Sequence, residues 1–227
     1  MTTAGFFGKL PAHGDFVDRN WPAAAITAWD HWLQQALTRS REQLGERWLD
    51  TYLTSPLWRF GLSAGCIDDN SWFGILLPSV DRVGRYFPLL LAAPLDADCH
   101  LAGTFMAAQD WFEQLERIGF AALEQGLQAD ALEEQLRALA PPPSRRALKK
   151  NGNGIYRAGV LSEAWPELLE WQWRAAGDEA IASLWSSAGS SAVQPCVLMA
   201  RGLPDSEGFA AMLDGQWPHW GWTESAN

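Results

Sequence analysis

The sequence predicts an α/β protein of the α+β type, with a mainly antiparallel sheet that contains a β-meander and is layered with helices. Three observations predict this class. Strand-like runs follow one another in the middle of the chain with only short turns between them, and parallel strands cannot be joined by such turns. Helical stretches before and after these runs carry apolar residues at spacings of three and four. Hydrophobic residues make up 48% of the 227 positions, which is enough for a sizeable core.

The first third of the chain predicts a strand, a turn and a long helix. Residues 4–10 are short, apolar and aromatic, as strands often are, and the turn-forming sequence PAHGD follows. Asn20 is expected to start a helix with Pro22 in its first turn, and residues 46–53 should form a second short helix. The core-facing stripe of the long helix should be Ile26, Trp29, Leu33, Ala36 and Leu37.

The middle of the chain predicts the meander and then further helices. Strand-like runs over 57–65, 71–80 and 86–95 are separated by the turns CIDDN and DRVGR, so they should pair as successive hairpins. Residues 103–139 repeat apolar side chains at helical spacing. The proline run at 141–143 should end this helical region, because proline lacks a backbone donor.

The last third predicts that strands return. Residues 145–157 are rich in basic side chains and should form an exposed loop. Two strands are expected over 182–187 and 196–200, followed by a short helix over 205–213. The tail after it cannot be a regular helix because of its proline.

Length favours one domain over the whole chain. The mass of 25.1 kDa suits a single large domain, and no internal repeat is visible. We therefore expect one domain over 1–227, with a motif-rich sheet part over 1–95 and a helical part with returning strands over 103–227.

Charge and cysteine content disfavour several classes of function. The 17 lysines and arginines against 27 aspartates and glutamates give a net charge of −10, which disfavours nucleic acid and anionic membrane surfaces as partners. The three cysteines match no zinc spacing, and no apolar run approaches the roughly 20 residues of a membrane span. We expect a cytoplasmic protein with reduced cysteines and without membrane insertion, metal or cofactor.

The stretch GFFGKLPAHGDFVDR, residues 5–19, could be a phosphate-binding loop. Such a loop needs a glycine five positions before the Gly-Lys pair and a hydroxyl side chain after it. With Gly8 and Lys9 as the pair, these positions hold Thr3 and Leu10. The pattern therefore favours a strand punctuated by glycine.

The same stretch could support acid/base or metal chemistry through His13, Asp15 and Asp18. No other histidine lies at metal-binding spacing, so a structural interpretation is favoured. In that interpretation Gly14 makes a turn, Asp15 bonds local backbone amides and His13 is exposed. Nucleophilic hydrolysis is also disfavoured, because the chain has no G-x-S-x-G motif and Cys66 and Cys99 are expected to be small buried hydrophobic residues.

The turn SVDRVGRYFP leaves two interpretations open. In the first interpretation, ion pairs join the first loop to the meander. They would form between Asp15 or Asp81 and Arg59 or Arg19. Alternatively, the turn could be a recognition surface for a carboxylate or phosphorylated segment. The 14 tryptophans likewise favour core packing, with a partner surface as the other option.

Three blocks of sequence resemble the TagF (ImpM) family of type VI secretion accessory proteins. They are GFFGKLPAHGDFVDR, SPLWRF and GILLPSVDRVGRYFPL, in the family's order and spacing. The resemblance implies a cytoplasmic, non-enzymatic regulator, a post-translational repressor of type VI secretion system assembly that opposes threonine phosphorylation. It implies the forkhead-associated scaffold protein, Fha, as partner, and a longin-like layered fold.

The motif blocks supply the candidate residues for partner binding or for the fold. These are Lys9, His13, Asp15, Arg19, Trp58, Arg59, Asp81, Arg82 and Arg85. The alternative hypothesis is a small hydrolase or phosphate-binding enzyme, which needs His13 and Asp15 to meet Arg59, Asp81, Arg82 and Arg85 in one pocket. A third hypothesis is a structural component of the secretion machine.

Overall fold

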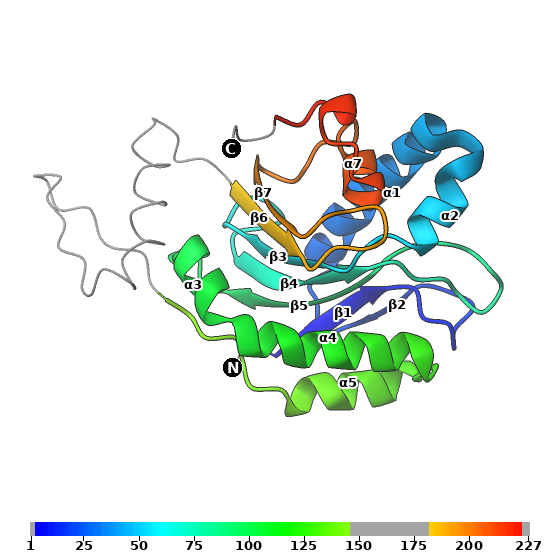
Figure 1. Ribbon diagram of the computed structural model, residues 1–227. Coiled ribbons are helices and arrows are strands. Elements are labelled where there is room, and N and C mark those ends of the chain that lie inside the picture. Colours follow the sequence, from blue (N-terminus) through cyan, green and yellow to red (C-terminus); the bar gives the residue numbers. More distant parts are fainter. Residues whose placement is uncertain (1–2, 146–181, 224–227) are drawn as a thin grey trace, which may run out of the picture.

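The computed structural model describes residues 3–145 and 182–223, which form one seven-stranded sheet with helices on both faces (Figure 1). Every pair of neighbouring strands is antiparallel, in the order β2-β1-β5-β4-β3-β6-β7. The strands are β1 (Gly5–Gly8), β2 (Val17–Arg19), β3 (Trp58–Leu62), β4 (Ser71–Leu77), β5 (Leu89–Leu95), β6 (Ala182–Ser187) and β7 (Cys196–Arg201). The predicted fold class is confirmed.

The meander β3-β4-β5 forms the centre of the sheet, as its short turns predicted. Trp58 pairs with Leu76 across β3 and β4, and Ser71 pairs with Leu95 across β4 and β5. The N-terminal strands extend the sheet beyond β5, and the two returning strands extend it beyond β3. Segments from both ends of the chain therefore flank the meander.

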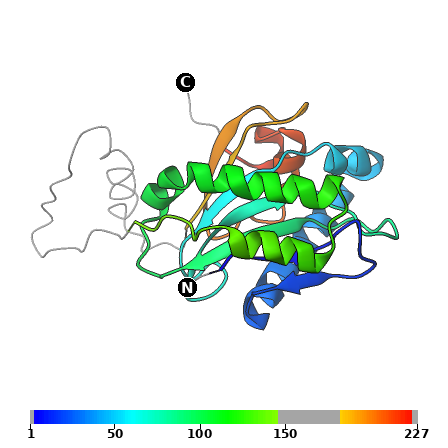
Figure 2. The same cartoon turned by 90° about the horizontal axis from the view of Figure 1, so that it is seen from below.

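Helices cover the two faces in two separate groups. One face carries α1 (Ala23–Leu44), the 3₁₀ turn η1 (Gly45–Arg47), α2 (Trp48–Leu53), α7 (Phe209–Asp214) and the 3₁₀ turn η2 (Pro218–Trp220). The other face carries α3 (Leu101–Ala107), α4 (Gln109–Glu124) and α5 (Ala129–Ala138), which lie in front of the sheet when it is seen from below (Figure 2). None of the helices in the described ranges is long and apolar enough to cross a membrane.

The core is divided in two by the sheet. Successive side chains of a strand point to opposite faces, so β4 supplies Trp72 and Leu76 to the α1 side and Phe73, Ile75 and Leu77 to the α4 side. Because both faces are covered, β4 is buried along its whole length. This explains why its sequence after Ser71 is continuously apolar rather than alternating.

Tryptophans mainly build the core on the α1 side. Trp29, Trp58, Trp72 and Trp185 are fully buried there. Trp29 packs on Trp32 at a ring distance of 5.6 Å. Among the described residues no tryptophan is fully exposed, which supports the core interpretation; Trp165, Trp171 and Trp173 lie outside the described residues.

Two local predictions in the first third are wrong. Asn20 does not cap α1, because Pro22 occupies the cap position and Asn20 instead adopts a left-handed turn with φ 62°. The loop after β1 also contains the short strand β2, paired with β1. A strand of three residues is too short to show a period of two, so it left no signal.

The predicted basic loop 145–157 lies outside the described residues except for Arg145.

Candidate functional site

The turn between β4 and β5 is a tight structure closed by a bridge between Val80 and Tyr86. The amide of Asp81 donates to the carbonyl of Arg85 at 3.0 Å, and the amide of Gly84 donates to the carbonyl of Asp81 at 3.0 Å. Gly84 has φ 86°, a conformation that favours glycine. Residues 80–86 thus project from the sheet as a hairpin tip.

The Asp81 carboxylate is the centre of this hairpin tip. Its side chain has no exposed surface and accepts four hydrogen bonds. Oδ1 accepts from the backbone amides of Val83 (3.0 Å) and Arg85 (2.9 Å), while Oδ2 accepts from Lys9 Nζ (2.5 Å) and Arg85 Nε (2.7 Å). Burial opposes ionisation, but the Lys9 and Arg85 bonds outweigh it and hold the pKa of Asp81 well below its usual range.

Lys9 brings the end of β1 to this carboxylate. Its ammonium is buried and lies 4.6 Å from the ring centre of Phe16. This is a cation–π contact, in which the face of the aromatic ring attracts the positive charge. Gly8 before it has φ 138°, and a Cβ there would lie 2.1 Å from the carbonyl oxygen of Pro88. The Gly8-Lys9 pair therefore serves the strand and its ion pair, not a phosphate.

The loop 11–16 and the hairpin tip form one unit although about 70 residues separate them. The carbonyl of His13 accepts from the amide of Arg82 at 2.8 Å. The Arg85 guanidinium donates to the carbonyl of Gly14 and pairs with Asp15 at 3.2 Å. The predicted link between first loop and meander is present, but the predicted partners are wrong, because Asp81 binds Lys9 and Arg85 and Asp15 binds Arg85.

Arg59 and Arg19 bind the helices of the other face instead. Arg59 makes a two-pronged contact with Glu116 of α4, at 2.6 and 2.9 Å. Its cationic side chain between two apolar strand residues is thereby compensated. Arg19 pairs with Asp130 and Glu133 of α5. Neither arginine takes part in the hairpin tip.

Trp58 belongs to the core. Its indole is buried and donates to the carbonyl of Met212 in α7 at 3.2 Å, and Trp217 packs edge-on against it. It therefore has no surface for a partner.

His13 is half-buried and carries a structural hydrogen bond rather than standing exposed. Its Nε2 accepts from the amide of Ala129, the first residue of α5, at 3.0 Å. The start of α5 has no side-chain cap of its own, so His13 supplies one from a distant loop. The predicted bonds of Asp15 to local backbone amides are likewise replaced by its pairing with Arg85.

We expect His13→Ala to lower the free energy of unfolding by about 1 kcal/mol, the usual effect of a lost cap. Urea unfolding followed by circular dichroism measures the change. His31→Ala, at an exposed position of α1, is the matched control and should shift stability by less than about 0.5 kcal/mol. Equal stability of His13→Ala and wild type would contradict this role.

Tyr52 holds α2 against the base of the hairpin. Its phenol is buried, donates to the carbonyl of Ser79 at 2.9 Å and accepts from the amide of Ser79 at 3.0 Å. Burial raises the pKa of Tyr52 above its usual value, against a smaller lowering by the Ser79 bond and by nearby Arg41. The neutral phenol is therefore the form that the fold requires.

Tyr52→Phe should lower the free energy of unfolding by about 1–3 kcal/mol at pH 7, because it leaves the buried Ser79 amide without a partner and the Ser79 carbonyl with only the Phe87 amide as donor. The pH dependence follows from the raised pKa. An unfolded tyrosine ionises at about pH 10, so wild-type stability should fall as the pH rises above that value. Denaturant unfolding between pH 7 and 11 tests this, and the variant should show a smaller fall. A parallel fall in both proteins would contradict the assignment.

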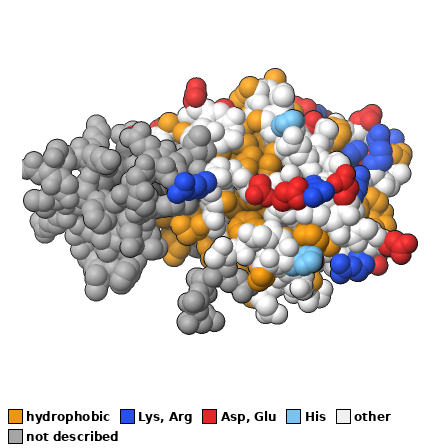
Figure 3. All heavy atoms as spheres, turned by 90° about the horizontal axis from the view of Figure 1, so that it is seen from above, with side chains coloured by type: hydrophobic (Ala, Val, Ile, Leu, Met, Phe, Trp, Pro, Cys, Tyr) orange, Lys and Arg blue, Asp and Glu red, His pale blue; other side chains and the backbone are white. Residues whose placement is uncertain are grey.

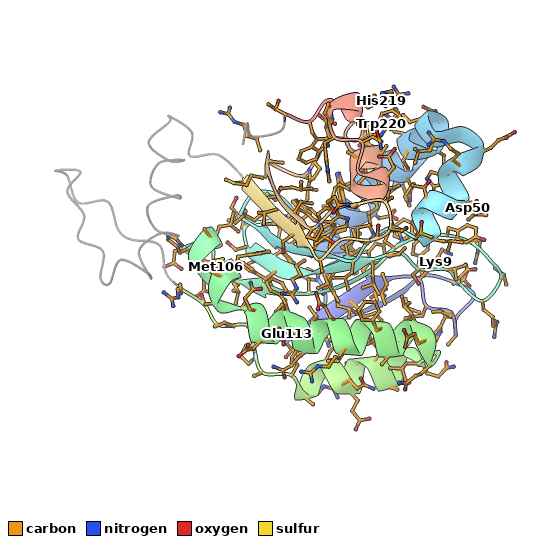
Figure 4. The ribbon with its side chains drawn as sticks, in the orientation of Figure 1. Lys9, Asp50, Met106, Glu113, His219 and Trp220 are labelled. Atoms are coloured by element: carbon orange, nitrogen blue, oxygen red, sulfur yellow. The ribbon has the colours of Figure 1, made fainter. Side chains whose placement is uncertain are left out.

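Above this buried framework the surface is partly apolar. Val83 at the tip is 64% exposed and Phe16 is 46% exposed. Neighbouring α2, which packs on the hairpin through Trp48 and Tyr52, exposes Leu49 and Leu53. We call the surface of residues 11–16, residues 80–86 and α2 the hairpin end. It lies at the opposite end of the molecule from Met106 of α3, as the positions of Lys9 and Asp50 show (Figure 4).

The described residues offer little for catalysis. They contain no group of three or more side chains suited to a metal ion. Burial raises the pKa of the Cys66 thiol to about 11 and also raises that of Cys196, so neither is a ready nucleophile. The Asp81 carboxylate is saturated by donors, and His13 Nε2 is occupied.

A family model described as the TagF N-terminal domain, type VI secretion system-associated, matches residues 5–139. The chain belongs to the TagF family. It is therefore a type VI secretion-associated protein. The matched region contains the loop 11–16, the hairpin tip and the Lys9–Asp81 ion pair.

A solved structure is similar to this chain over nearly the whole length of both proteins. The crystal structure of PA0076 from Pseudomonas aeruginosa PAO1 is similar with a TM-score of 0.85 and 34% sequence identity. The similarity covers 99% of this chain and 98% of that one. No curated protein matches.

Sequence reasoning missed one ion-pair partner and one pairing in this TagF protein. Glu116 was overlooked as the partner of Arg59, although its place on the buried side of an amphipathic helix was a usable signal. Lys9 was singled out as a candidate for partner binding or for the fold, but not as the partner of Asp81. Nothing in the sequence indicates that Lys9 and Asp81 lie next to each other in the fold.

Proposed function

We propose that the chain is a non-enzymatic, cytoplasmic repressor of type VI secretion system assembly, and that it acts by binding the forkhead-associated scaffold protein. The hairpin end is the face that binds. A binding role requires an exposed surface that is held rigidly, because ordering a loose surface on binding costs free energy.

The single observation that supports this proposal is the arrangement of the hairpin tip. Val83 and Phe16 are exposed apolar side chains, and the Arg82 guanidinium has no hydrogen-bond or ion-pair partner within the described ranges. Directly beneath them, the Asp81 carboxylate accepts two hydrogen bonds from backbone amides of the tip and two from the side chains of Lys9 and Arg85. An apolar tip, a free arginine and a rigid base are typical of a protein interface.

The enzyme hypothesis receives less support from the same geometry. It needs Arg59 beside His13 and Asp81, whereas Arg59 is held by Glu116 and Gln109 on the other face of the sheet. The carboxylate and imidazole that would do chemistry are engaged in the fold. Binding therefore explains the exposed residues better than catalysis does.

The proposal is tested by mixing the purified chain with the purified forkhead-associated scaffold of the same secretion system and measuring binding by calorimetry. We expect a saturable complex. In cells, overproduction of the chain should lower secretion without changing the amounts of the apparatus proteins, because the repression acts after their synthesis. The absence of a complex would refute the partner, and unchanged secretion would refute the repressor role.

A further inference from the structure

An open groove of about 230 Å³ lies between α1 and the last residues of the hairpin. Its lining is Gln34, Leu37, Thr38, Arg41, Tyr86 and Phe87. It adjoins the hairpin end, because Tyr86 belongs to the hairpin tip and packs against Trp48 of α2. Because four of its lining residues belong to α1, the groove lies on the α1 side of the sheet. The view from above onto this side shows acidic and basic side chains interspersed (Figure 3).

No acidic side chain pairs with Arg41 among the described residues, a feature that it shares with Arg47 and Arg82. Its guanidinium lies 4.2 Å from the ring centre of Trp48, a cation–π contact that fixes the plane of the group. In the part of the chain that the structure describes, it has no hydrogen-bond partner. By contrast, carboxylates pair with Arg19, Arg39, Arg59, Arg85 and Arg137.

Two hydroxyl groups that line the groove also lack hydrogen-bond partners among the described residues. Within residues 3–145 and 182–223 the Thr38 hydroxyl and the Tyr86 phenol make no hydrogen bond. Thr38 is a clear exception, because Thr27 and Thr51 each donate to the carbonyl four residues earlier in the chain. Leu37 and Phe87 complete the groove with apolar surface.

We propose that this groove receives an aspartate or glutamate side chain from a docking segment of the protein partner. Arg41 would bind the carboxylate through its free N–H groups, with the hydroxyls of Thr38 and Tyr86 as further donors. A planar guanidinium held by stacking matches the two oxygens of a carboxylate. Every lining side chain lacks a negative charge, so nothing in the groove opposes an acid.

The partner's identity rests on the proposed function, but the chemistry of the groove does not. The probe for the chemistry is a nonapeptide with three glutamates among alanines and leucines, together with its counterpart in which glutamine replaces each glutamate. The reporter is the indole N–H signal of Trp48 in NMR spectra, because this ring stacks on Arg41. The full chain is titrated with each peptide.

We expect the glutamate peptide to shift the Trp48 signal saturably, and the glutamine peptide to bind at least about fivefold more weakly, as loss of a charge-assisted contact implies. Arg41→Gln should abolish the response. Arg47→Gln is the matched control, since Arg47 is exposed, lies close in the chain and has no ion pair among the described residues; it should respond like wild type. No shift in wild type, equal shifts with both peptides, or an unchanged response in Arg41→Gln would overturn the inference.

A second variant separates this inference from the proposed function. Thr38→Phe fills the groove from an exposed position of α1 and should weaken binding of the forkhead-associated scaffold by about tenfold. If wild type does not bind the scaffold but does bind the glutamate peptide, only the partner is wrong. If the scaffold binds wild type and Thr38→Phe equally, the groove is not its docking site.

Discussion

Asp81→Asn is expected to lower the free energy of unfolding by about 3–5 kcal/mol, because it leaves the buried Lys9 ammonium without a compensating charge. The variant also removes the charge that holds Arg85 Nε at 2.7 Å. Since the pKa of Asp81 is lowered in the folded protein, its contribution is present above the pKa of an unfolded aspartate, about 4, and is lost as the pH falls further. The stability gap between wild type and variant should therefore be constant from pH 7 to 5 and shrink below pH 4.

Urea unfolding provides the measurement, and two further variants provide the controls. Asp15→Asn removes the other carboxylate on Arg85, but Asp15 is 95% exposed, so the change should be no more than about 1 kcal/mol. Lys9→Met combined with Asp81→Asn should be more stable than Asp81→Asn alone, since no buried charge is then unpaired. A loss below about 1 kcal/mol for Asp81→Asn would contradict the buried ion pair as the support of the hairpin.

The second large effect is expected at the tip itself. Arg82→Glu combined with Val83→Asp should weaken binding of the forkhead-associated scaffold by at least about tenfold while leaving the unfolding free energy within about 0.5 kcal/mol of wild type. Val83 is exposed, and the Arg82 side chain has no partner within the described residues, so neither side chain supports the fold. Calorimetry of the complex and urea unfolding give the two quantities.

The choice of control matters because the arginines of the hairpin are not equivalent. Arg85 binds Asp81, Asp15 and the carbonyl of Gly14, so reversing its charge would disturb the fold and the surface together. Arg117→Glu is the better control, because Arg117 is exposed on α4 and bonds only a backbone carbonyl. Equal weakening by Arg117→Glu and by the tip variant would indicate a non-specific charge effect and contradict the hairpin end as the interface.

Periodicity and turn chemistry predicted most of the fold. The meander was visible because its strands are long and apolar and its connections are too short for crossovers. The strands β6 and β7 were visible as separate runs, but that they return to the same sheet beside β3 depends on pairings between distant residues. The matched family region ends at residue 139, before β6 and β7, although these strands complete the same sheet.

The site could be predicted only as a set of candidates. The sequence singled out Lys9, Asp81 and Arg85, but it could not pair Lys9 with Asp81, because a salt bridge across about 70 residues depends on which strands lie side by side. The sequence also could not show which of the candidate side chains are exposed to solvent. Lys9 and Arg82 are both cations beside a turn, yet Lys9 is buried against a carboxylate and Arg82 is exposed.

Hydrogen–deuterium exchange of the chain, alone and bound to the forkhead-associated scaffold, tests most directly whether the hairpin end is the binding face. Backbone amides buried by a partner exchange more slowly, and the method reports each segment separately. The proposed function predicts slower exchange in residues 11–16, residues 80–86 and α2, with no change in α4 and α5. Protection confined to α4 and α5, with the hairpin end unchanged, would contradict it.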